Sequence, residues 1–110
     1  MLQFKIRGEN IELTQSLIDY AEKKFAKLNQ YFETEHDAIG RINLKAYTDS
    51  HDGYKTHEFK VEFTTFLDSV TFRAEDASSD MYASIDHTVE KIERQIRKHK
   101  TKINRKARKI

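Results

Sequence analysis

Four segments of this chain alternate between apolar and polar residues with a period of two, and this pattern restricts the fold more than any other feature. Side chains of a β-strand point in turn to opposite faces of the sheet, so each segment predicts a strand with one apolar face. A sheet of such strands is covered on one side only. The residues assigned to the covered face are Leu2, Phe4, Ile6, Ile42, Leu44, Ala46, Phe59, Val61, Phe63, Val70, Phe72 and Ala74.

Short polar segments separate the strands. Gly8 and Asn10 are expected to end the first strand. Residues 48–53 predict the next turn, with positive φ at Asp52-Gly53, and residues 65–69 predict a short connection to the last strand. The last three strands can form an antiparallel meander. The first strand must connect through a helix, so we expect it to lie parallel to a neighbour.

Two amphipathic helices can cover the apolar face of the sheet. Apolar residues recur at spacings of three and four over residues 15–32, with Thr14 as the expected N-cap. The same spacing runs from Tyr82 to Ile103 and predicts a second helix, which Asp80 or a neighbouring serine can cap. If it reaches about Arg105 it is about 39 Å long, longer than strands of about 20–33 Å, so its last turns should extend past the core.

These elements predict an α+β fold. The order β-α-β-β-β-α gives a two-layer sandwich, a four-stranded sheet with two helices on one face. Part of this order, three strands and a helix, is similar to double-stranded-RNA-binding domains. Residues 1–102 are expected to form this domain, with residues 103–110 as a basic tail or the start of a linker.

Charge is divided unevenly along the chain. Residues 91–110 hold ten of the twenty Lys and Arg and one of the eighteen Asp and Glu. The net charge of +2 therefore combines nine positive charges in this segment with seven negative charges in residues 1–90. Like charges three or four residues apart repel one another in a helix. Folding gives no reason to align them, whereas a polyanionic partner does.

The basic residues fall on the two predicted helices, which lie on the same side of the sheet. Their basic edges are therefore expected to flank one groove that suits an RNA backbone. The candidate RNA-binding residues are Lys23, Lys24, Lys27, Lys91, Arg94, Arg97, Lys98, Lys100, Lys102 and Arg105.

The open face of the sheet carries charges of both signs, and we expect cross-strand ion pairs to explain most of them. The basic residues there are Lys5, Arg7, Arg41, Lys45, Lys60 and Arg73, and the acids are Glu58, Glu62 and Glu75. Most strand aromatics face the core by alternation. Tyr47 is the exception, on the outer face, where it could stack on a base.

Composition argues against several other classes of function. The chain has no cysteine, which excludes disulfides, thiolate zinc sites and a cysteine nucleophile. Its five histidines show no metal-ligand spacing, and no glycine-rich phosphate loop is present. We therefore expect that the chain is not an enzyme and that it binds no cofactor and no metal. The chain has no long apolar run and no signal-peptide core, so a cytoplasmic protein without membrane partners is expected.

Several motifs together resemble one known family. They include the run Ile6-Arg-Gly-Glu-Asn-Ile-Glu12, the run Asp80-Met-Tyr-Ala-Ser-Ile-Asp86 and, most specifically, Lys91-Ile-Glu-Arg-Gln-Ile-Arg-Lys-His-Lys-Thr-Lys102. This pattern, over essentially the whole chain, resembles the ribosome hibernation promoting factors, also called ribosome-associated inhibitors.

The resemblance implies a function. Members of the family bind the small (30S) ribosomal subunit between its head and body, where mRNA and the A-site and P-site tRNAs would lie. They silence translation in stationary phase or under stress. The resemblance implies that the basic residues of both helices would contact 16S rRNA phosphates and that inhibition is competitive occupancy without chemistry.

Long members of the family add a linker and a C-terminal domain that pairs two ribosomes. The tail from Ile103 to Ile110 resembles the start of that linker. The resemblance thus suggests the N-terminal domain of a long form, which would bind subunits without dimerising them, whereas the full-length form would dimerise ribosomes.

Two other functions remain open on the sequence alone. A general double-stranded-RNA-binding module would bind any A-form duplex with comparable affinity. A basic amphipathic helix could instead dock on an anionic membrane or a partner protein, which would require a free apolar face on the second helix. An enzyme is the weakest alternative.

Overall fold

The computed structural model describes residues 1–32, 37–51 and 53–108. Its elements follow the predicted order, with one short 3-10 helix added. They are β1 (Leu2–Glu9), α1 (Gln15–Phe25), the 3-10 helix η1 (Ala26–Tyr31), β2 (Ala38–His51), β3 (Tyr54–Leu67), β4 (Val70–Ser78) and α2 (Met81–Arg108).

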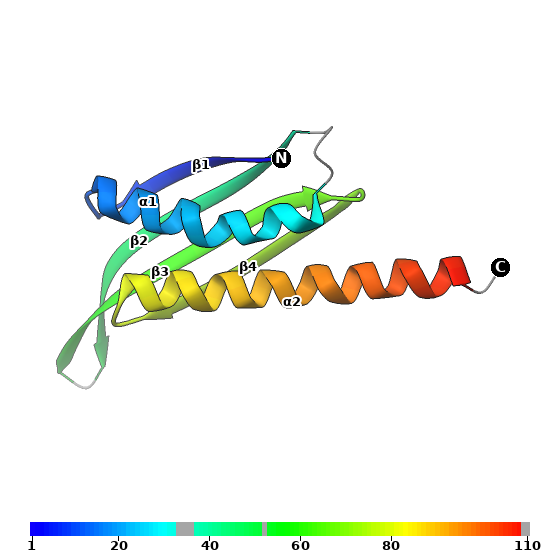
Figure 1. The fold of residues 1–110 in the computed structure, drawn as a ribbon. Coiled ribbons are helices and arrows are strands. Elements are labelled where there is room, and N and C mark those ends of the chain that lie inside the picture. Colours follow the sequence, from blue (N-terminus) through cyan, green and yellow to red (C-terminus); the bar gives the residue numbers. More distant parts are fainter. Residues whose placement is uncertain (33–36, 52, 109–110) are drawn as a thin grey trace.

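The four strands form one sheet in the order β1-β2-β3-β4. β1 runs parallel to β2, while β2, β3 and β4 are antiparallel neighbours, as the connections predicted. Both helices lie side by side over the same face of this sheet (Figure 1). The predicted α+β two-layer fold is therefore confirmed.

The strands are longer than predicted because backbone pairing continues where the apolar alternation stops. β1 includes Gly8, which pairs with Leu44, and the chain turns only at Asn10, with φ of 57°. A Cβ at Gly8 would lie 2.9 Å from Cγ of Leu13, so close packing and not a strand break accounts for this glycine.

Both hairpins also have shorter turns than predicted. Strand pairing between β2 and β3 continues to His51 and Tyr54, so residues 48–51, which were predicted as part of the turn, belong to β2. Gly53 has φ of 83°, as expected, and Asp52 lies outside the described residues. β3 runs to Leu67, so the turn to β4 is not residues 65–69 but Asp68-Ser69, with φ of 53° and 63°. Positive φ at both residues is typical of a type I′ turn.

The predicted helix over residues 15–32 is in fact two helices. The hydroxyl of Thr14 caps α1 by accepting the N–H of Leu17 at 3.2 Å, as predicted. α1 ends at Phe25, and the tighter η1 follows. The Asn29 side chain in η1 accepts the N–H of Leu2 at 2.7 Å, which ties this turn to β1. Apolar spacing could not reveal the change, because Leu28 follows Phe25 by three residues, a spacing that places both on one face of either helix type.

The core lies between the sheet and the helices. The rings of Phe25 from α1 and Phe63 from β3 stack with centroids 4.3 Å apart at its centre. From α2 the buried residues include Ile85, Ile92 and Ile96, and also Met81, which the sequence pattern missed.

α2 extends past the sheet (Figure 1). Asp80 caps it by accepting the N–H of Tyr82 at 3.1 Å. Two residues of its predicted apolar stripe do not belong to the core: Tyr82 is 41% exposed at the start, and Ile103 is 42% exposed beyond the end of the sheet. The helix continues to Arg108, so residues 103–108 are helical.

Candidate nucleic-acid interface

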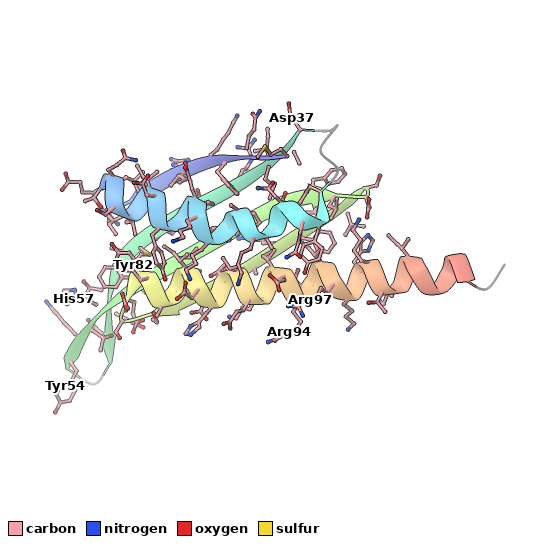
Figure 2. All side chains as sticks on the ribbon, viewed as in Figure 1. Asp37, Tyr54, His57, Tyr82, Arg94 and Arg97 are labelled. Atoms are coloured by element: carbon pink, nitrogen blue, oxygen red, sulfur yellow. The ribbon has the colours of Figure 1, made fainter. Side chains whose placement is uncertain are left out.

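Several basic residues of α2 lie on its exposed surface. Arg94 and Arg97 lie there on successive turns, both exposed (Figure 2). Lys98 and Lys102 continue from Arg94 at intervals of four residues, so these three side chains form one stripe along the helix.

A groove lies between η1 and α2. It has a volume of about 270 Å³ and is lined by Lys27 from η1 and by Val89, Glu90, Glu93, Arg94 and Arg97 from α2. The structure thus brings Lys27, Arg94 and Arg97 together. Lys27 belongs to η1, however, and the groove is also lined by two acids, Glu90 and Glu93, that were not predicted there.

One of these acids orients a candidate residue. Glu93 and Arg97 form an ion pair one helical turn apart. The hydrogen bond from Arg97 to Glu93, with the charge of that carboxylate, raises the pKa of the guanidinium above its ordinary value. Since Glu93 is mostly buried, it holds Arg97 at the rim of the groove.

Lys91 lies away from the groove and joins α2 to β4. Its ammonium donates to the Asp76 carboxylate and to the Glu75 carbonyl, both at 2.9 Å. His87 contacts the same carboxylate at 3.0 Å. Lys91 therefore has an internal partner, so folding alone explains its position.

Lys100 and Lys24 also have internal partners. Lys100 and His99 both contact the Asp68 carboxylate, at 3.0 and 3.2 Å, which fastens α2 to the β3–β4 turn. Lys24 lies 3.8 Å from the Asp86 carboxylate. The hydrogen bond from Lys100 lowers the pKa of Asp68; burial opposes this change, and His99 adds to it.

The remaining candidates form a separate set, which we call the unpaired cations. Within the described part of the chain, no acid lies within ion-pair distance of their side chains. They are Lys23, Lys27, Arg94, Lys98 and Lys102. Arg105 lies on α2, but its side chain is outside the described residues.

The apolar face of α2 is not free. Ile85, Ile92 and Ile96 are fully buried against the sheet, and Val89 is 4% exposed. The free apolar face that docking on a membrane would require is therefore missing along this part of the helix. Among the described residues, neither helix combines the length and apolar character needed to span a bilayer.

The contact that spaces the two helices was not among the predicted features. Tyr20 of α1 donates to Asp86 of α2 at 2.8 Å, and its ring packs edge-on against Tyr82 at 4.7 Å. The only signal was that Tyr20 and Tyr82 each occupy the edge of an apolar stripe. To predict that these two rings meet, one must know how α1 is aligned with α2, and the sequence does not give that alignment.

The chain is similar to known proteins over nearly its whole length. A family model described as sigma 54 modulation protein / S30EA ribosomal protein matches residues 4–104. The chain belongs to this family. The S30EA fold is also found in the N-terminal domain of Thermus thermophilus Protein Y, with a TM-score of 0.68, 26% identity and coverage of 86% of this chain and 93% of that one. A ribosomal subunit interface protein from Coxiella burnetii has the same fold, with a TM-score of 0.69, 20% identity and coverage of 92% and 99%.

Three relatives carry the name ribosome hibernation promotion factor. Those of Lactococcus lactis subsp. cremoris (strain MG1363), Bacillus subtilis (strain 168) and Staphylococcus aureus (strain COL) are 49%, 47% and 41% identical over 98%, 97% and 98% of this chain. The family resemblance found in the motifs is thereby confirmed. The chain covers 55%, 53% and 53% of those proteins, so it spans about half the length of the curated relatives it matches.

Proposed function

We propose that this S30EA-family domain binds the small ribosomal subunit in the decoding channel and inhibits translation in stationary phase or under stress. The names of its relatives, ribosome hibernation promotion factors and a ribosomal subunit interface protein, support binding to the ribosome. The cytoplasm is then its site of action.

One observation carries the proposal at the level of residues. The unpaired cations lie on α1, η1 and α2, the helical layer of the molecule, and have no acid partner among the described residues. Stacking Arg94, Lys98 and Lys102 one above another destabilises an isolated helix. Phosphates of 16S rRNA would neutralise them and release counterions, which is the main source of affinity for RNA.

The mechanism requires no chemical step. The paired cations Lys91 and Lys100 hold α2 against β4 and against the β3–β4 turn, and thereby fix the stripe of unpaired cations. A rigid domain seated in the channel excludes mRNA and tRNA by occupying their space. The extent of inhibition then depends on affinity and concentration, and no substrate is turned over.

Co-sedimentation with purified small subunits tests the proposed site. The 110-residue chain should pellet with subunits, and mRNA together with tRNA should displace it. An A-form RNA duplex at equal nucleotide concentration should displace it poorly. Equal displacement by the duplex would favour the general double-stranded-RNA binder, and displacement by neither competitor would place the domain outside the channel.

Charge reversal tests the residues. Replacing Arg94, Lys98 and Lys102 together with Glu should leave the fold intact by circular dichroism and abolish pelleting with subunits at moderate salt. The wild-type 110-residue chain should also fail to produce a ribosome dimer peak in a sucrose gradient, since we propose that dimerisation requires a further domain of the long form.

A further inference from the structure

The open face of the sheet is divided into two halves with different chemistry. In one half, Lys45 lies 3.4 Å from both Glu9 and Glu62, and Lys60 lies 3.5 Å from Glu62 and 3.4 Å from Glu75. Burial raises the pKa of Glu62, but the two lysines outweigh this effect and hold that pKa below its ordinary value. The expected cross-strand ion pairs are therefore present in this half.

The other half has cations without such partners. The strand register places Lys5, Arg41, Thr64 and Arg73 in one row across all four strands. Among the described residues, Lys5 and Arg41 have no ion pair, and Arg73 only approaches Glu62 at 4.0 Å. Like charges on neighbouring strands destabilise a sheet, so folding gives no reason for this row.

The next row toward the β3–β4 turn is apolar and exposed. Phe66 pairs with Thr71 and is 59% exposed, although most aromatic side chains in this chain are covered. Ile39 is 42% exposed and lies beside Phe66, because its neighbour Gly40 pairs with Thr65. The Thr65 hydroxyl donates to the Ile39 carbonyl at 3.0 Å and fixes the two strands to each other at this point.

Members of both rows line one concave surface, Arg41 and Thr64 from the first row and Ile39, Phe66 and Thr71 from the second. A cavity of about 390 Å³ is lined by Ile39, Arg41, Thr64, Phe66 and Thr71, together with the neighbouring Asp37, Ala38 and Thr65. An exposed ring, a guanidinium and two hydroxyl-bearing side chains therefore face the same space. Of the described residues that line it, Asp37 is the only acid, at the end of the sheet opposite the β2–β3 tip, where Tyr54 lies (Figure 2).

We propose that this surface, the sheet-face site, binds an unpaired nucleotide of ribosomal RNA, with the base on Phe66 and the phosphates along the row of Lys5, Arg41 and Arg73. Single-stranded RNA is commonly recognised in this way, by bases that stack on aromatic side chains of a sheet while cations contact the backbone. The carboxylate of Asp37 repels phosphates, so the phosphates should lie near Arg41 and Arg73 and away from Asp37.

Other partners fit the surface less well. A duplex keeps its bases stacked inside, so it could not use the Phe66 ring. A protein partner needs an apolar contact far larger than two exposed side chains. The helices and the sheet-face site lie on opposite faces of the domain. A domain seated in a channel would therefore contact RNA through both faces. This inference rests on the proposed function for its choice of ribosomal RNA as the ligand.

The first test uses a six-nucleotide single-stranded RNA as the probe and fluorescence anisotropy as the readout. Stacking of a base on an aromatic side chain contributes about 1–3 kcal/mol, so Phe66→Ala should raise the Kd at least about fivefold. Phe66→Tyr keeps the ring and should restore binding. Tyr54→Ala is the matched control, because Tyr54 is 77% exposed at the hairpin tip and lies outside the site.

The location is tested by NMR titration of the amide signals. The probe should shift the signals of Ile39, Phe66 and Thr71, and should do so in the Glu variant of Arg94, Lys98 and Lys102 as well. Shifts confined to α2, or an equal loss of affinity in Tyr54→Ala, would overturn the sheet-face site. Subunit binding that survives in that Glu variant, with these shifts retained, would overturn the proposed function of the helices alone.

Discussion

The Tyr20 hydroxyl lies 2.8 and 3.0 Å from the two carboxylate oxygens of Asp86, and this hydrogen bond joins α1 to α2. The ammonium of Lys24 lies 5.4 Å from the centre of the Tyr20 ring and 3.8 Å from the same carboxylate. The contact fixes the spacing of the two helices that carry the unpaired cations.

Removal of the Tyr20 hydroxyl should destabilise the domain. Tyr20→Phe loses a hydrogen bond to a charged, partly exposed acceptor, so the free energy of unfolding should fall by about 1 kcal/mol. The melting temperature should fall by about 4 °C. Urea unfolding measures the change, and Tyr54→Phe is the control, because that side chain is exposed and should leave stability unchanged.

The same contact predicts that the free energy of unfolding depends on pH in the alkaline range. The hydrogen bond to Asp86, together with burial, raises the pKa of Tyr20 above its ordinary value of 10.0. The folded protein thus holds this proton more tightly than the unfolded chain, and the resulting stabilisation is complete below about pH 10 and lost as pH rises further. The stability difference between wild type and Tyr20→Phe should therefore shrink from pH 9 to pH 11. A constant difference would contradict this assignment.

The ion pairs of Asp68 predict that the free energy of unfolding falls as the pH is lowered in the acidic range. Its pKa is lowered chiefly by the hydrogen bond from Lys100, so its contribution is present above about pH 4 and lost as pH falls. Asp68→Asn should destabilise the protein slightly at pH 7, by at most about 1 kcal/mol, and by less at pH 3. Asparagine tolerates the positive φ at this position, so the variant isolates the charge. Urea unfolding at pH 7 and at pH 3 measures the stability difference between wild type and Asp68→Asn. A larger difference at pH 3 than at pH 7 would rule out this role for Lys100.

Gly40 is needed for close packing and not for its backbone angle. A Cβ at this position would lie 2.9 Å from Cε2 of Phe63 and 3.1 Å from Cδ1 of Phe4. Gly40→Ala should therefore lower the free energy of unfolding by about 1–3 kcal/mol. In a Phe63→Leu background the cost should be smaller, because the ring that clashes is gone. Equal costs in both backgrounds would show that Phe63 is not the obstacle.

The sequence predicted most of the architecture because alternation and helical spacing are local. Leu2, Ile42 and Phe63 face the core as expected, and β1 lies parallel to β2 because a helix connects them. The strand ends were wrong because polar residues such as Thr48 pair through the backbone as well as apolar ones do. The switch to η1 at Ala26 could not be predicted, since the three-residue spacing from Phe25 to Leu28 fits an α-helix as well as a 3-10 helix.

The division of the basic residues could not be predicted. The pattern shows that Lys91, Lys98 and Lys100 lie near one another on a helix. It does not show that Lys91 contacts Asp76 in β4 and that Lys100 contacts Asp68, while Lys98 contacts no acid among the described residues. These pairings depend on how α2 lies over the sheet. The cation row of the open face likewise depends on a register that joins Lys5 to Arg41.

The salt dependence of binding to small subunits tests the central claim, that the unpaired cations contact phosphates of the ribosome. Each phosphate contact contributes about −0.9 to the slope of log K against log salt. The double variant Arg94→Ala, Lys98→Ala should therefore flatten the slope by about 2, without loss of stability. The matched control Arg7→Ala, Lys55→Ala removes the same charge elsewhere and should keep the wild-type slope. If the two double variants have the same slope, the stripe on α2 is only a solvated helix face.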